Sequence, residues 1–92
     1  MKLYTTADQT KHLIELGFKR PVGTGYNYSI GELISFLVNP VIEGQPEVWI
    51  VSYDSGIKNL PPFIEEELVD ALYETCIHSK KIEKLYDKER TA

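Results

Sequence analysis

The sequence contains only one cysteine, Cys76, in 92 residues. One thiol cannot form a disulfide within the chain, and it cannot supply the several sulfur ligands of a cysteine-rich zinc site. Both kinds of stabilisation are therefore excluded. Because Cys76 falls on the apolar stripe of a predicted helix, we expect a buried structural thiol rather than a nucleophile.

Long hydrophobic runs are also absent. No stretch approaches the ~20 apolar residues that a membrane span requires. The opening segment, MKLYTTADQTKHL, has no apolar run resembling that of a signal peptide. The sequence therefore predicts no membrane association and a cytoplasmic location.

An excess of basic residues is lacking, with ten Lys and Arg against fourteen Asp and Glu and a net charge of −4. A general nucleic-acid binder normally carries a basic surface, so nucleic acid is disfavoured as a partner. Lys80, Lys84 and Lys88 are the one basic feature, since they would form an i, i+4 stripe if the last helix extends that far. An accessory role on nucleic acid through this stripe remains the alternative interpretation.

No constellation of catalytic or ligand-binding residues can be recognised. The sequence contains neither a G-x-G-x-x-G loop nor a G-x-S-x-G elbow. Glu65, Glu66, Glu67 and Asp70 are best explained as the solvated start of a helix, where acidic side chains are favoured by the helix dipole. His12 is expected to be a partly exposed helix residue. We therefore expect no enzyme activity, no metal, no cofactor and no small-molecule ligand.

The segment YSIGELISFL, residues 28–37, follows two glycines and could be mistaken for a phosphate-binding loop. Ser29 and Glu32 have the spacing of a capping box, in which each side chain accepts a hydrogen bond from the other's backbone N–H. A carboxylate would then already occupy the positive end of the helix. We expect a helix that buries Leu33, Ile34 and Leu37 and stops at residues 39–40.

Two other helices are indicated. Thr6 and Gln9 form a second capping box, and Gly17 is placed to end that helix in a left-handed conformation. After Pro61 and Pro62, an apolar residue recurs every fourth position from Ile64 to Cys76, which is typical of a long amphipathic helix. We expect it to run to about residue 86.

The middle of the chain predicts β structure. Residues 48–53 are mostly β-branched and aromatic and should form a strand. Val48, Ile50 and Ser52 should point to one side of it, and Trp49, Val51 and Tyr53 to the other. Val41 and Ile42 could pair with it across a turn at residues 44–46, and residues 57–60 could return as a further strand. Trp49 is expected to be substantially buried between this strand and a helix.

The order of these segments resembles a group of small uncharacterised proteins encoded in genomes, prophages and phages of gut Bacteroidales. The resemblance covers most of the chain and is carried by YTTADQTKHLIELGFKRP, YSIGELISFL, WIVSYD and ELVDALYETCIHSK. Since no activity is known for that group, the resemblance implies an origin and an architecture but no catalytic residues.

The sequence thus predicts a single α+β domain over residues 1–92. Two short N-terminal helices should precede a small antiparallel β element, with a long C-terminal helix packed on it. We expect a non-enzymatic interaction protein of phage or mobile-element origin that binds a protein partner or itself. Tyr26 and the outward face of the strand are candidate contacts, because tyrosine is enriched at interfaces.

Overall fold

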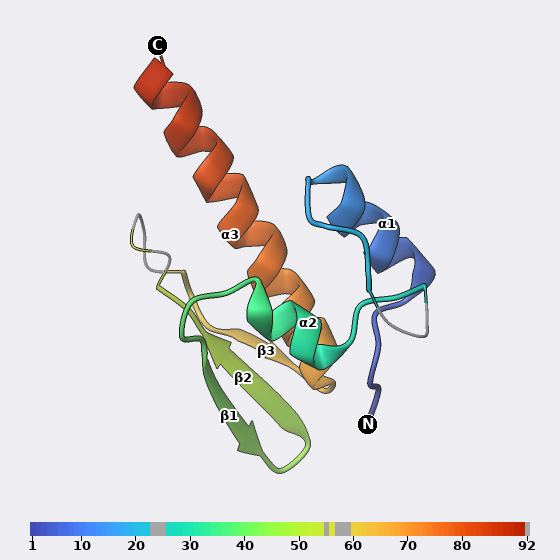
Figure 1. The fold of residues 1–92 in the computed structure, drawn as a ribbon. Helices are drawn as coiled ribbons and strands as arrows, with labels where there is room; N and C mark the ends of the chain where they lie inside the picture. The colour runs from blue at the N-terminus through green and yellow to red at the C-terminus, as the bar shows by residue number, and fades with distance from the viewer. Residues whose placement is uncertain (23–25, 55, 57–59, 92) are drawn as a thin grey trace.

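The computed structural model describes residues 1–22, 26–54, 56 and 60–91, with the side chains of 89–91 outside the description. It forms the small α+β fold expected from the sequence (Figure 1). The elements in chain order are α1 (Ala7–Glu15), α2 (Ile30–Ser35), β1 (Val41–Gln45), β2 (Val48–Ser52), β3 (Phe63–Glu65) and α3 (Leu68–Thr91). The strands form one antiparallel sheet in the order β1-β2-β3.

The two capping boxes that begin α1 and α2 are confirmed. At α1, the hydroxyl of Thr6 accepts from the N–H of Gln9, and the Gln9 amide oxygen accepts from the N–H of Thr6. The end of α1 is also as expected, because Gly17 has φ +103°. Its N–H donates to the carbonyl of Ile14 and that of Phe18 to the carbonyl of Leu13, which is the Schellman pattern.

Helix α2 is shorter than the sequence predicts. Ser29 and Glu32 cap its start as expected, but the helix ends at Ser35 rather than at residues 39–40. Three further residues then lead to Asn39, which has φ +53°. Asparagine tolerates this left-handed conformation better than most residues do, so the chain reverses there and enters β1.

The turn between β1 and β2 lies further along the chain than expected. Gln45 pairs with Val48, so Pro46 and Glu47 form the loop, while Gly44 and Gln45 belong to β1. Proline fixes φ at the first loop position, and Glu47 has φ +73° at the second, as in a type II turn. The predicted turn at 44–46 was therefore wrong by one to two residues.

The prediction that the long helix begins near Ile64 is also wrong. Phe63 to Glu65 form β3, which pairs with β2, and Ile64 lies opposite Ile50. Helix α3 begins at Leu68. Its first backbone hydrogen bonds run from the N–H groups of Asp70 and Ala71 to the carbonyl of Glu67. Ile64 fits the four-residue spacing of the apolar positions in α3, but it belongs to an extended segment that pairs with β2. The strand expected at 57–60 falls mostly outside the described residues.

The N-terminal segment is attached to the start of α3. The backbone N–H of Lys2 donates to the Glu67 carboxylate at 2.7 Å, and its ammonium contacts the Asp70 carboxylate at 2.8 Å. The amide of Gln9 donates to the same Asp70 oxygen. Residues more than 60 positions apart are thereby held together at one end of the molecule.

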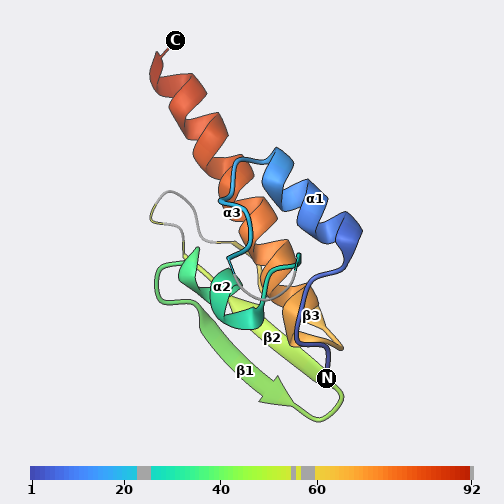
Figure 2. The same cartoon turned by 45° about the vertical axis from the view of Figure 1, so that its right-hand side comes forward.

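The core lies between the inner face of the sheet and α3, with α2 beside it (Figures 1 and 2). Val51 from β2 and Leu72 from α3 are fully buried. Cys76 is buried as predicted, and its thiol donates to the carbonyl of Leu33 in α2 at 3.6 Å. Trp49 packs against this core and is partly buried, which fits the substantial burial expected from the sequence. It lies next to the β1–β2 turn, opposite Gly44.

Helix α3 extends further than expected, to Thr91 rather than about residue 86. Its first half packs on the sheet, and Ile77 is the last buried position among its described side chains. Residues 80–91, which we call the arm, project beyond the rest of the molecule (Figures 1 and 2). The molecule is accordingly elongated, with principal extents of 43, 29 and 19 Å.

Candidate partner-binding surfaces

The sheet has one covered and one uncovered side. Paired residues of an antiparallel sheet share a face, and neighbours along a strand alternate. The register therefore places Val51 and Phe63 on the inner side, toward α3. The opposite side, which we call the outer face, consists of Val41, Glu43, Gln45, Val48, Ile50, Ser52 and Ile64.

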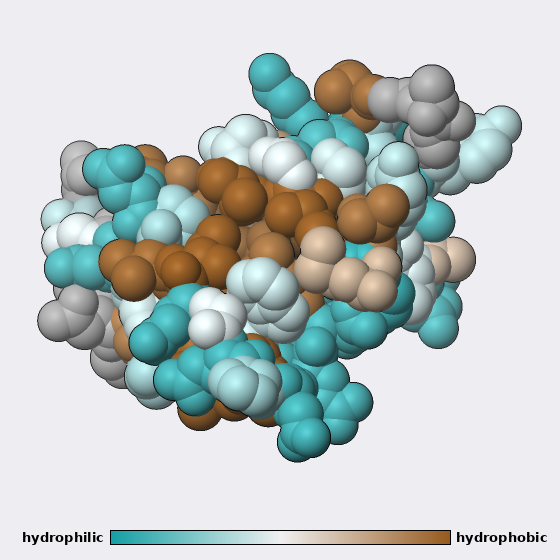
Figure 3. Space-filling model, turned by 90° about the horizontal axis from the view of Figure 1, so that it is seen from below, coloured by the Kyte–Doolittle hydropathy of each residue, from teal (hydrophilic) through white to brown (hydrophobic). Residues whose placement is uncertain are grey.

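The outer face is unusually apolar. Val41 and Ile64 are 64% and 57% exposed, and Val48 and Ile50 between them are half-buried. Seen from below, a continuous brown band crosses this side of the molecule (Figure 3). A sheet covered on one side usually carries polar residues on the other, and contiguous apolar surface commonly marks an interaction site. No described element packs on this face.

The outward face of the strand was a candidate contact in the sequence analysis, and two of its apolar residues, Val48 and Ile50, were visible there. The contribution of Ile64 was missed, because that residue was assigned to a helix. The signal that could have identified it is Pro61-Pro62 followed by Phe63 and Ile64, since aromatic and β-branched residues favour a strand.

The three lysines of the predicted stripe lie in two different environments. Since α3 is helical to Thr91, Lys80, Lys84 and Lys88 lie at i, i+4 spacing along one helix. Lys80 is half-buried, with its ammonium 5.3 Å from the centre of the Phe18 ring, a cation–π contact. Lys84 and Lys88 are exposed on the arm, and Glu83 and Asp87 alternate with them. The arm also carries Leu85, which is 60% exposed.

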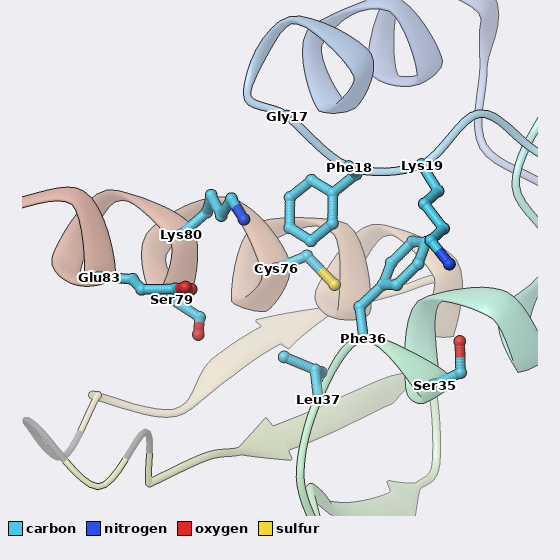
Figure 4. Close-up of a pocket in the computed structure, with 10 residues that line it drawn as sticks. All are labelled: Gly17, Phe18, Lys19, Ser35, Phe36, Leu37, Cys76, Ser79, Lys80 and Glu83. Carbon is cyan, nitrogen blue, oxygen red and sulfur yellow. The ribbon is translucent and has the colours of Figure 1, made fainter.

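A hollow of about 450 Å³ lies where the α1–α2 connection, α2 and α3 meet (Figure 4). Phe18 and Phe36 line it with their rings 4.9 Å apart, and the thiol of Cys76 points into it. Lys80 and Glu83 lie at its margin. It offers an apolar floor with charges of both signs above it, which suits an apolar side chain of a partner better than a defined anion.

Tyr26 lies apart from the outer face and the arm. Its side chain is 94% exposed and borders a second hollow, of about 310 Å³, together with Arg20, Asn27 and residues of α1. The structure therefore does not bring Tyr26 together with Lys80, Lys84 and Lys88 in one surface.

His12, Tyr73 and Cys76 are ionisable residues that are partly or fully buried. His12 is partly exposed as predicted, and its Nδ1 lies 2.8 Å from the hydroxyl of Tyr73. Burial raises the pKa of Tyr73, and the nearby Glu74 carboxylate adds to the effect. Burial likewise raises the pKa of Cys76 to about 12. At neutral pH this thiol stays protonated, and a protonated thiol is a poor nucleophile.

The acidic residues near the start of α3 are dispersed. Glu65 lies in β3. The Glu67 carboxylate accepts a hydrogen bond from the N–H of Lys2, and the Asp70 carboxylate accepts from the Lys2 ammonium and the Gln9 amide. Among the described residues, no three His, Cys, Asp or Glu side chains are grouped as metal ligands. Within the same residues, no helix has the length and hydropathy needed to cross a membrane.

Comparison with models of protein families, with curated proteins and with solved structures gave no significant match for this chain. The resemblance to small proteins of gut Bacteroidales and their phages therefore stays a prediction.

Proposed function

We propose that this chain is a non-enzymatic interaction protein, encoded by a phage or another mobile element, that binds protein through the outer face of its sheet. The observation that carries the proposal is the row of apolar residues left uncovered there, of which Ile64 and Val41 are more than half exposed. Full burial of one such side chain gives about 1.5–3 kcal/mol, so a partner that covers this face gains substantial free energy.

The character of the remaining surface supports this proposal. A protein interface needs an apolar centre and a polar rim. The outer face has Ile50 near its centre and Glu43 beside it in the same cross-strand row. Glu47, in the adjoining turn, is exposed. A partner with an apolar segment flanked by basic residues suits this arrangement.

Two matched variants test the proposal. Ile64→Lys places a charge on the β3 side of the outer face, next to Ile50, whereas Val22→Lys makes the same change at a residue that is 79% exposed on the α1–α2 connection. The tagged wild type and both variants are incubated with extract from the cells that express the protein, and bound proteins are quantified by mass spectrometry. Self-association is measured in parallel by sedimentation.

We expect the wild type and Val22→Lys to bind the same protein, or themselves, and Ile64→Lys to lose that binding at least about tenfold, because a charge must be desolvated to enter an apolar contact. Equal binding by Ile64→Lys and the wild type would contradict the proposal, as would the absence of both self-association and any retained protein.

An accessory role on nucleic acid is the second candidate, and one observation favours it: α3 is long enough to align Lys80, Lys84 and Lys88. Three lysines neutralise few phosphates, and the interspersed Glu83 and Asp87 reduce their field. We expect no binding of random duplex or single-stranded DNA at micromolar protein and physiological salt. Micromolar binding that weakens steeply with salt, by a monomeric chain, would promote this candidate.

A further inference from the structure

The arm and the rest of the chain carry opposite charge. Residues 80–91 contain five basic and three acidic side chains, while residues 1–79 contain five basic and eleven acidic ones. The arm therefore has a net charge of about +2 and the remainder about −6 when histidines are neutral. Electrostatic complementarity of this kind favours contact between the arm of one molecule and the body of another.

The arm also carries apolar residues that are partly exposed. Ile82 is partly buried, Leu85 is 60% exposed and Tyr86 is 42% exposed. Residues three and four apart lie on one side of a helix, so Ile82, Leu85 and Tyr86 form one stripe. Lys81 and Lys84, both exposed, lie close to this stripe in the sequence.

The outer face and the arm match in size and chemistry. A strand of five residues is about 17 Å long, and twelve helical residues span about 18 Å. The apolar stripe of the arm would meet Ile50 and Ile64, and its lysines would approach Glu43 and Glu47. Helix α3 already packs its first half on the inner side of the same sheet, so a helix on a sheet is a contact that this sequence forms.

A sheet-to-sheet dimer is less favourable by the same reasoning. Two copies related by a two-fold axis would bring the same surface of each together. Glu43 and Glu47 of each copy would then approach acidic surface of the other, and like charges across an interface oppose binding.

We infer that the outer face receives the arm of a second copy of this chain. The inference rests on the proposed function, since it names the partner. Figures 1 and 2 place the arm and the sheet at opposite ends of the molecule, so the contact is head-to-tail. Each bound copy then still presents one arm or one outer face, and association continues beyond two copies unless a ring closes.

Two variants separate the two sides of this contact. Ile64→Lys damages the outer face and leaves the arm intact, while Leu85→Glu damages the arm and leaves the outer face intact. Both side chains are more than half exposed, so circular dichroism and the unfolding midpoint should match the wild type. Val22→Lys is the control. Sedimentation over a range of concentrations gives the average mass of each sample and of a 1:1 mixture of the two variants.

We expect the wild type and Val22→Lys to exceed twice the chain mass of 10.5 kDa as concentration rises, and to dissociate in high salt. Ile64→Lys alone and Leu85→Glu alone should each remain a monomer. Their mixture should associate but stop at two chains, because one intact arm meets one intact outer face. This complementation is specific to a head-to-tail contact.

Association of Leu85→Glu equal to that of the wild type would overturn the inference, as would a mixture that stays monomeric while the wild type associates. In both cases the proposed function stands if Ile64→Lys still abolishes binding. A wild type that is monomeric at every concentration also overturns the inference, and the extract experiment with Ile64→Lys then decides the proposed function separately.

Discussion

The indole of Trp49 covers Gly44, the residue directly opposite it on β1. A methyl group added at Gly44 would lie 3.0 Å from Cζ3 of the indole and within 3.4 Å of two more of its ring carbons. The absence of a side chain at position 44 thus allows the half-buried ring to lie against the β1 backbone. This close approach explains a glycine inside a strand, where it is otherwise unfavourable.

Gly44→Ala should displace the indole of Trp49. Because the ring is half-buried it can move outward, so we expect a loss of about 1 kcal/mol in the free energy of unfolding, at the low end of the cost of overpacking. The fluorescence maximum of Trp49, the only tryptophan, should shift to longer wavelength. An unchanged spectrum would mean that the ring does not lie over Gly44.

Ser29→Ala removes the hydroxyl that accepts the N–H of Glu32 at the start of α2. We expect the free energy of unfolding to fall by about 1 kcal/mol, the usual cost of a lost N-cap. Chemical denaturation measures this change, and Ser35→Ala, at the exposed end of the same helix, serves as a comparison. A midpoint unaltered by Ser29→Ala would show that the cap contributes nothing.

Glu47→Gly should stabilise the protein. Glu47 holds φ +73° in the turn between β1 and β2, a conformation that costs an L-residue roughly 1–2 kcal/mol and costs glycine little. The greater freedom of glycine in the unfolded chain offsets part of this gain. We expect a net increase of about 0.5–1 kcal/mol in thermal or chemical unfolding, whereas destabilisation would indicate a different turn.

Acid should weaken the attachment of the N-terminal segment to α3. Burial acts to raise the pKa of Asp70, but hydrogen bonds from Lys2 and Gln9 and the charge of Lys2 outweigh it, so the pKa lies below its ordinary value. The unfolded chain then binds the proton more readily. The stabilisation is complete above the unfolded pKa, near 3.9, and is lost as pH falls through the lower folded value.

Asp70→Asn should therefore reduce the loss of stability between about pH 5 and pH 2 relative to the wild type. Unfolding midpoints measured at several pH values provide the comparison, with Asp8→Asn as a control carboxylate in the first turn of α1. The same acid dependence in the wild type and in Asp70→Asn would assign the effect to other carboxyl groups.

The helix ends that depend on local hydrogen bonds could be predicted from the sequence. The capping boxes at Thr6 and Ser29 and the left-handed Gly17 depend on residues within a few positions of one another, and the structure has all three. The burial of Cys76 followed from its position on an apolar stripe.

The errors arose where distant contacts decide the conformation. Ile64 fits a helical period, but pairing with Ile50 draws it into β3. The turn at Pro46 and Glu47 requires a positive φ at a glutamate, and no residue pattern near position 47 indicates this. The place of Trp49 over Gly44 likewise depends on the register between β1 and β2.

For the candidate surfaces, Val48 and Ile50 were visible in the sequence as the outward side of a strand, but the outer face as a whole was not. Its extent depends on β3, which supplies Ile64, and on the absence of a covering element among the described residues. Neither can be read without the topology of the sheet.

The outer face should become covered when the protein binds its partner. Isoleucine methyl NMR with a soluble nitroxide tests it most directly, since the nitroxide attenuates exposed methyl signals. In dilute protein, Ile64 should be attenuated strongly and Ile42, on the inner side of β1, much less. At high concentration, or with the bound protein added, Ile64 and Ile50 should become protected while Ile42 is unchanged. Attenuation of Ile64 that stays the same under all these conditions would contradict the account.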